Sequence, residues 1–427
     1  MNLQTYERAQ LDAGLTVLCA AMPHVRSVSM GLYIPIGSRY EEAAQAGISH
    51  FLEHMLFKGC QGWPTALTIA NEIEGRGGYL NASTSQEFIS LWVKVGTRHW
   101  RQALSLLAGM AQQPLLDPAE CLRERGVILE EIAMNRDEPE DFVSQLSSQA
   151  LWGDHPLGRE IAGEAETVMG LDAESLRAFH QHTFHCGGMV LTLAGAIGMA
   201  EVVSAAAAEF GPAVAASARP TFLPAPHLPD HPRWRVHNRA TDQAHVQLAV
   251  PGLPRNSPDR FALRLLDVLV GDGMSSRLWQ RVREDLGLAY SIGSYRAAYA
   301  DSGVFGVYGG CDARRLYQML DAIQAVWRQV QEAPISADEL QHCKEYIKGR
   351  MELASEDSSS VAAWWGWQAA TGTEPWTLDQ TLAAIDAVTA ADVQRLAQQI
   401  WRPQALTLAY VGPRPNEKKL TKWLAAV

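Results

Sequence analysis

The chain has 427 residues, 47% of them hydrophobic, and a formal net charge of −11 at pH 7. This length exceeds what one hydrophobic core usually supports, so two domains of about 200 residues each are expected. The acidic balance argues against nucleic acid or an anionic membrane as a partner, and it mildly favours neutral or basic ligands.

The first residues, MNLQTYER, show no export signal and no Arg-rich presequence. No stretch of the chain approaches the roughly 18 apolar residues of a membrane span. Six scattered cysteines form no C-x-x-C pair, which is typical of reduced thiols in a cytosol. We therefore expect a cytoplasmic protein without a membrane partner.

Two strand patterns, at residues 15–20 and 28–34, precede the segment GISHFLEHMLFKG that starts at Gly47. No Gly or Pro interrupts residues 48–58 and the apolar residues recur at helical spacing, which predicts a helix. His50 and His54 then lie one turn apart on one face. Two imidazoles at this separation can bind one Zn²⁺, and Glu53 can reach a water on the metal.

The alternative is that two histidines and a glutamate fell at this spacing by chance. One such match somewhere in a chain so poor in histidine has a chance of roughly one in fifty. However, an otherwise apolar helix would have to bury two imidazoles and a carboxylate, which is costly without partners. A bound metal removes that cost, so we favour a metal site.

A helix at 68–74, a break at Gly75–Gly78, a strand over 81–95 and a helix at 100–112 are expected next. A second candidate for the site follows in the segment ERGVILEEI, from Glu124 to Ile132.

A catalytic zinc usually takes three protein ligands, so a third ligand has to come from elsewhere in the chain. At about 100° per residue, Glu131 lies over Val127 and Ile128 and nearly over Glu124. Glu130 points well away from that line. Glu131 is therefore the expected third ligand, and the alternative is a solvated, charged edge of a helix.

The order of elements then repeats. After a strand at 189–195, a Pro- and Ala-rich stretch at 212–233 predicts a linker. A strand (244–250), helices (260–269 and 276–285), strands (290–308) and helices (316–330 and 336–351) follow. An internal duplication explains this best. We expect an α+β protein of two homologous domains, 1–211 and 234–427, each a mostly antiparallel sheet packed against helices.

The second copy lacks the histidines, because RLLDVL at 264–269 stands in place of the metal motif. One zinc per chain is therefore expected.

The loop GDGMSSR at 271–277 lacks the Lys-Ser/Thr and the preceding strand of a nucleotide-binding loop. His180, His182 and His185 fit a partly exposed helix end or loop better than a second metal site. The tryptophans of 364–367 indicate packing or an interface.

The inverted motif His50-x-x-Glu53-His54, followed much later by Glu131 within ERGVILEEI, resembles the pitrilysin/insulinase family of zinc peptidases. GGYLNASTS at 77–85 looks like the edge strand of that family, HPLGR at 155–159 like its mid-domain loop, and REDLGLAY at 283–290 like its second-half signature. The resemblance covers nearly the whole chain.

The mechanism that follows is metal-assisted peptide hydrolysis. Zinc bound by His50, His54 and Glu131 would activate a water, and Glu53 would take the proton of that water and pass it to the leaving amine. Glu124 would orient the site without binding the metal.

The resemblance also implies substrate contacts outside the metal site. It implies that Arg283 and Tyr290 approach the substrate, with Tyr290 a candidate for stabilising the tetrahedral oxyanion. Asn81, Ala82 and Ser83 would pair with the backbone of a peptide substrate on an exposed sheet edge.

Larger members of the family carry four such domains, whereas this chain is similar to the processing-peptidase-like branch with two. That branch implies a chamber formed by two chains, either a homodimer or a heterodimer with a related, zinc-free two-domain chain. The other hypothesis is a non-catalytic binding or scaffold subunit of the same fold. The intact set of His50, Glu53, His54 and Glu131 argues against a scaffold.

Overall fold

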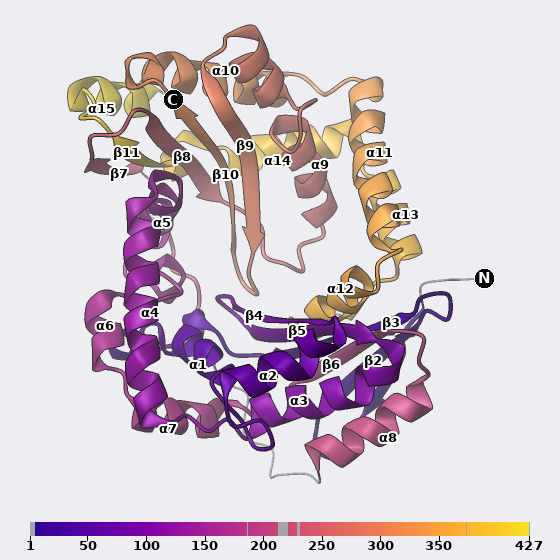
Figure 1. The fold of residues 1–427 in the computed structure, drawn as a ribbon. Coiled ribbons are helices and arrows are strands. Elements are labelled where there is room, and N and C mark those ends of the chain that lie inside the picture. Colours follow the sequence, from indigo (N-terminus) through magenta and orange to yellow (C-terminus); the bar gives the residue numbers. More distant parts are fainter. Residues whose placement is uncertain (1–4, 186, 212–220, 229–230, 373, 427) are drawn as a thin grey trace. The chain divides into compact units, whose positions relative to one another are not determined.

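The computed structural model of the protein describes residues 5–185, 187–211, 221–228, 231–372 and 374–426, and Figure 1 shows its fold. The chain divides into two compact units. The first consists of Met1–Ile132, Glu160–Leu223 and Met351–Leu378, and the second of Ala133–Arg159, Pro224–Arg350 and Asp379–Val427. Each unit contains one sheet and the helices that cover it.

The sheet of the first unit has the strand order β1-β2-β6-β3-β5-β4 and is antiparallel except between β2 and β6. Its strands are β1 (Glu7–Gln10), β2 (Thr16–Ala21), β3 (Ser27–Ile34), β4 (Tyr79–Thr84), β5 (Ile89–Gly96) and β6 (Val190–Gly195). Its helices are α1 (Ile48–Leu56), α2 (Ala66–Ile73), α3 (Trp100–Gln112), α4 (Pro118–Asp137, to Ile132), α6 (Ala165–Gly170), α7 (Ala173–Thr183), α8 (Met199–Phe210) and α12 (Ser358–Ala370).

The sheet of the second unit has the order β7-β11-β8-β10-β9, and only β7 and β11 run parallel. Its strands are β7 (Arg233–Asn238), β8 (Ala244–Pro251), β9 (Ala289–Ala298), β10 (Gly303–Cys311) and β11 (Thr407–Gly412). Its helices are α5 (Pro139–Trp152), α9 (Arg260–Val270), the π-helix η6 (Trp279–Asp285), α10 (Leu316–Glu332), α11 (Ala337–Ala354, to Arg350), α13 (Leu378–Ala387, from Asp379), α14 (Ala390–Ile400) and α15 (Glu417–Ala426).

The two sheets confirm the predicted duplication and the α+β fold. Leaving out β1, the strand order β2-β6-β3-β5-β4 of the first sheet recurs as β7-β11-β8-β10-β9, with the parallel pair at the same place. One expected strand is wrong in detail. Residues 81–95 form the two strands β4 and β5, because the backbone turns at Ser85, whose N–H donates to the carbonyl of Phe88.

The compact units group two helices differently from the linear bounds 1–211 and 234–427. Helix α5, from the first half of the sequence, packs on β11 and β8, and α12, from the second half, packs on β3 and β6. Those linear bounds therefore remain a prediction. In the expected linker 212–233, residues 212–220 and 229–230 lie outside the described residues, 221–228 form no helix or strand, and β7 begins at Arg233.

Helix α1 is fixed in the core of the first unit by its apolar face. Phe51, Leu52 and Met55 are fully buried, so the polar residues between them emerge together on the opposite side. The helix starts at Gly47, whose positive φ of 97° suits glycine, and a Cβ there would lie 2.6 Å from the carbonyl of Ala162.

The carboxylate of Glu41 caps the first turn of α1. It accepts hydrogen bonds from the backbone N–H of Gly47 and of Ser49, both at 2.8 Å. These donors have no partner within the helix, and a negative charge at a helix N-terminus is stabilising. The cap therefore sets where α1 begins and how its polar face is oriented.

The sheet of the first unit is covered differently on its two faces. Helices α1 and α3 lie on one face and α12 on the other (Figure 1). The side chains of β5 alternate accordingly, with Leu91 and Val93 in the core and Trp92 on the face of α12. Among the described residues, no helix is long and apolar enough to cross a membrane.

In the second unit, α9 follows β8 as α1 follows β3, but it carries an ion network where α1 carries histidines. The buried carboxylate of Asp267 accepts hydrogen bonds from Ser294 Oγ at 2.6 Å, Arg264 at 2.9 Å and Arg296 Nε at 3.2 Å. These contacts hold α9 to strand β9.

Replacing Asp267 by alanine should lower the free energy of unfolding by about 3 kcal/mol, because it leaves partly buried guanidinium and hydroxyl groups without their acceptor. Urea denaturation measures this. The matched control is Asp285→Ala, which removes only an exposed pair with Arg281 at 3.3 Å and should change stability very little. Equal effects of the two substitutions would contradict a structural role for Asp267.

Candidate metal centre

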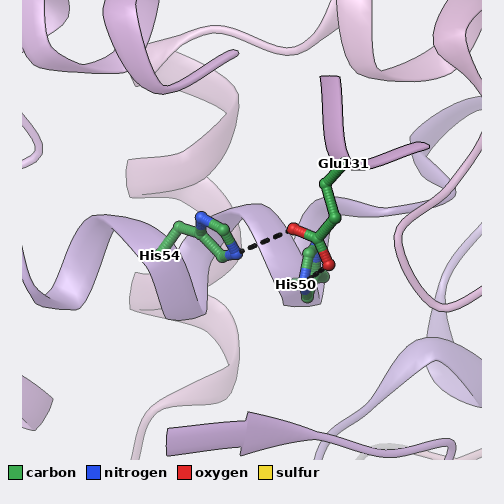
Figure 2. A group of neighbouring side chains, drawn as sticks. All are labelled: His50, His54 and Glu131. Carbon is green, nitrogen blue, oxygen red and sulfur yellow. Dashed lines mark ion pairs between the residues drawn. The ribbon is translucent and has the colours of Figure 1, made fainter. Parts of the chain in front are cut away.

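Helices α1 and α4 bring the three predicted ligands together in the first unit. His50 and His54 project from α1, and the carboxylate of Glu131 reaches both rings from α4 (Figure 2). Glu131 Oε1 lies 3.7 Å from His50 Nε2, and Glu131 Oε2 lies 3.5 Å from His54 Nε2. Within the described ranges, these three residues are the one group of His, Cys, Asp or Glu whose possible ligand atoms all lie within 4.8 Å of one another.

The donor set fits zinc. Two imidazole nitrogens and a carboxylate oxygen are the ligands of one common type of catalytic zinc site, which keeps a fourth position for water. With metal–ligand bonds of about 2.0–2.1 Å in a tetrahedron, two ligand atoms lie roughly 3.3 Å apart. The separations of 3.5 and 3.7 Å between Glu131 and the two rings are close to that value.

Helix α4 places Glu124 and Glu131 on one flank of its buried face. Ile128 and Ile132 are buried in the core, Glu124 is buried beside them, and Glu130 is exposed. Of the two apolar residues over which Glu131 was expected to lie, Ile128 is buried and Val127 is 52% exposed. At about 100° per residue, Val127 lies on the outer side of the line from Glu124 to Glu131 and Ile128 on the inner side.

Glu124 orients His54 from behind. Its Oε1 lies 2.9 Å from His54 Nδ1, and its Oε2 accepts from Lys58 Nζ at 2.5 Å. With Nδ1 donating to Glu124, Nε2 of His54 is left as the acceptor that faces Glu131. Burial alone would lower the pKa of His54, but the hydrogen bond and charge of Glu124 outweigh it and raise that pKa.

Lys58 was not among the predicted site residues. It lies four residues after His54, just beyond the end of α1 at Leu56, and this spacing is the signal that could have found it. Burial would raise the pKa of Glu124, but the hydrogen bonds from His54 and Lys58 lower it below its usual value. Glu124 is therefore kept ionised, as an acceptor for both groups.

His50 is held neutral by its surroundings. Burial, together with the nearby His54, lowers the pKa of His50 to about 4. Its Nδ1 is buried without a hydrogen-bond partner, and its ring lies 4.5 Å from that of His54, centroid to centroid. A neutral imidazole has a free lone pair, which is the form that binds a metal.

Glu53 lies beside this group without belonging to it. Its Oε2 accepts a hydrogen bond from Thr84 Oγ1 at 2.5 Å, and burial raises its pKa above the usual value. Thr84 ends strand β4, so this bond joins the polar face of α1 to the edge of the sheet. Thr84 was not predicted as a site residue, although it directly follows Asn81, Ala82 and Ser83 in the sequence.

The three residues predicted to pair with a substrate lie on β4. This strand ends the sheet, with β5 as its one partner among the described residues. Asn81 and Ser83 are exposed on the face of α12, and Ala82 is buried on the other face. Asn81 Oδ1 accepts from the N–H of Ala82 at 2.9 Å, and Ser83 Oγ lies 3.0 Å from Ser90 Oγ.

Arg283 and Tyr290 lie together in the second unit. Arg283 donates to the backbone carbonyl of Tyr290 at 2.8 Å, and its guanidinium lies 4.1 Å from the ring centre of Trp279 and 4.6 Å from that of Tyr290. The Tyr290 side chain is 77% exposed. The approach of these two residues to a substrate stays a prediction.

Two further sequence features have structural roles. His180, on α7, bonds to the carbonyl of Ala111 at 2.7 Å and belongs to no metal group in the described part of the chain. In the tryptophan cluster, Trp365 is buried on the sheet, with its ring 4.5 Å from that of Tyr6. A Cβ on Gly366 would lie 2.1 Å from the ring of Tyr33, so close packing of α12 requires this glycine.

Comparison with known proteins gives the family. Residues 16–165 match the insulinase family (peptidase family M16), and residues 170–347 match the domain described as the peptidase M16 inactive domain. The chain belongs to this family.

The relatives are similar over their full length. An uncharacterized zinc protease of Streptomyces coelicolor is 35% identical over 98% of this chain and 92% of its own. Another from Bacillus subtilis is 35% identical over 96% of this chain and 99% of its own. A crystal structure of a protease from Helicobacter pylori has a TM-score of 0.91 at 22% identity, over 96% of this chain and 100% of its own, which shows the shared fold.

Proposed function

We propose that this protein is a zinc-dependent endopeptidase that hydrolyses unfolded peptides. The observation that carries the proposal is the group of His50, His54 and Glu131, with ligand atoms within 4.8 Å of one another, beside the non-ligand carboxylate of Glu53. A purely structural metal site would have its fourth position closed by a protein ligand. One zinc per chain is proposed, because α9 carries no histidine in the second copy.

Each side chain has a defined role in this mechanism. His50, His54 and Glu131 would hold zinc, which would supply a coordinated water of lowered pKa and polarise the scissile carbonyl. Glu53 would take the proton of that water and deliver it to the leaving amine, and burial, which raises the pKa of Glu53, suits it to hold the proton in between. Glu124 keeps the Nε2 of His54 directed at the metal position, and Thr84 fixes the carboxylate of Glu53.

The substrate would add a strand to the free edge of β4. The N–H of Ser85 donates to the carbonyl of Phe88, on the side of β5. Because the direction of the backbone N–H alternates along a strand, the N–H groups of Asn81 and Ser83 also face β5. The backbone groups of Ala82 then face outward, and they would pair with an extended peptide once the Ala82 N–H exchanges its bond to Asn81 Oδ1 for one to the peptide. Glu53, bonded to Thr84 on the same strand, would lie beside the peptide.

The remaining parts of the proposal follow from the family. Two chains would enclose the substrate, as a homodimer or as a heterodimer with a related zinc-free chain. Arg283 and Tyr290 would approach the substrate within the chain or across the dimer, and the protein would act in the cytoplasm.

Metal analysis of protein purified without chelator, combined with a quenched-peptide assay, distinguishes an enzyme from a non-catalytic scaffold subunit. A metal-free protein that cleaves nothing at any zinc concentration would favour the scaffold.

Unstructured peptides of a few tens of residues should be cut, and stably folded proteins should not. Strand addition requires an extended substrate, and a folded domain would have to unfold to supply one, at a cost of about 5–15 kcal/mol. The measurement compares a small folded domain with its denatured, alkylated form. Equal cleavage of both would rule out an enclosed site that accepts only extended chains.

A further inference from the structure

The face of the first sheet that carries α12 is only partly covered. Helix α12 packs on β3 and β6, and in the described part of this unit no other helix covers the same face over β5 and β4 (Figure 1). Two large aromatic side chains lie on this uncovered part. Tyr79, on β4, is 67% exposed, and Trp92, on β5, is 40% exposed.

These aromatic residues belong to rows of side chains that run across the strands. The register pairs Gly31 on β3 with Trp92 on β5, and Trp92 with Asn81 on β4. In the next row, Lys94 on β5 is paired with Tyr79 on β4. Tyr79 and Trp92 are therefore diagonal neighbours. Both adjoin the short side chain of Asn81, Tyr79 along β4 and Trp92 across on β5.

A cleft of about 280 Å³ adjoins Trp92. Its other lining residues include Gly31, Tyr33 and Ala362. The nearby charge is already paired, because Lys94 Nζ bonds to Asp357 Oδ1 at 2.5 Å. The surface therefore offers aromatic contacts and no free lysine charge.

A peptide strand added to the edge of β4 would extend these rows by one member each. It would lie about 4.8 Å from β4 and roughly 9.6 Å from β5, and every second side chain would lie on the face of Tyr79 and Trp92. A large apolar side chain on that face, opposite Asn81, would be a diagonal neighbour of Tyr79. The indole of Trp92 lies one strand further in the same row, with only the short side chain of Asn81 in between.

We propose that Tyr79 and Trp92 form a subsite for one large apolar, preferably aromatic, side chain of the substrate, which rests on the peptidase function proposed above. The subsite lies away from the cut. Tyr79 and Asn81 precede Thr84, the partner of Glu53, by five and three residues, or roughly 10–17 Å along the strand. The preference should therefore fall three to five residues from the scissile bond, on one side only.

The test moves a single Phe through an otherwise Ala- and Ser-rich quenched peptide, at each of the six positions on either side of the cut. In the unmodified protein, Phe at one position in the window should raise kcat/KM about 10-fold over Ala at that position. Tyr79→Ser and Trp92→Ser should each reduce this ratio to about 1–2, and Trp92→Phe should restore most of it. The matched control, Trp234→Ser, removes a tryptophan on β7 that is also 40% exposed and should leave the ratio unchanged.

Calorimetric binding of the same peptides to zinc-loaded Glu53→Gln protein separates the subsite from the catalytic proposal. Tighter binding of the Phe peptide that Tyr79→Ser abolishes would support the subsite, even if no peptide were cut and the peptidase function failed. Cleavage with the same Phe ratio in the Tyr79→Ser variant would overturn the subsite and leave the peptidase function intact. If the protein neither cleaved nor bound any of the peptides, both the subsite and the peptidase function would be overturned. Tyr79 is largely exposed, so its variant should fold even if the Trp92 variants do not.

Discussion

Glu53→Gln should lower kcat by about 100-fold or more while the protein keeps its zinc. The carboxylate of Glu53 lies beside the candidate ligands and can accept a proton from the water, and loss of a general base typically costs about 10²–10⁴ in rate. Glutamine has nearly the same shape, and its carbonyl can still accept the hydrogen bond that Thr84 Oγ1 makes to Glu53 at 2.5 Å. A change in rate would therefore report lost chemistry and not a displaced strand.

Two measurements check this expectation, namely kcat on a quenched peptide and the zinc content per chain. The control is Glu74→Gln, an exposed carboxylate on the segment that follows α2, for which neither value should change. If the Glu53 variant lost its zinc, Glu53 would be a ligand and the assigned roles would be wrong.

Glu131→Gln should weaken zinc binding by about 10-fold or much more, because it removes the charged ligand that faces both imidazoles. Glu131 Oε1 and Oε2 lie 3.7 and 3.5 Å from the two Nε2 atoms. Glu130 is exposed on another side of the same helix, so Glu130→Gln should leave the zinc Kd within a few-fold of the original value.

The two variants are matched controls for each other, since both remove one negative charge from α4 at neighbouring positions. Competition with a chelator of known zinc affinity measures each Kd, and urea denaturation confirms that both variants are folded. If Glu130→Gln weakened zinc binding more than Glu131→Gln did, the third ligand would move by one residue and α4 would have to be rotated.

Local periodicity in the sequence was sufficient to indicate the helix face that carries the candidate metal ligands. His50 and His54 are separated by one helical turn, and the angle per residue distinguished Glu131 from Glu130 before any contact was known. The repeated order of strands and helices likewise predicted the duplication, which the two sheets confirm, because every strand of the first sheet except β1 has a counterpart in the second. These features depend on spacing within one element or on the order of elements, and both can be read along the chain.

The rest of the site was decided by contacts between residues far apart in sequence. The bonds from Glu124 to His54 and Lys58, and from Thr84 to Glu53, join α1 to α4 and to the edge of the sheet. No periodicity encodes which side chains meet when two elements pack, because that depends on the crossing of the elements and on the burial of both. For the same reason, the sequence did not indicate the packing of α12 on β3, where the absence of a Cβ at Gly366 admits the ring of Tyr33.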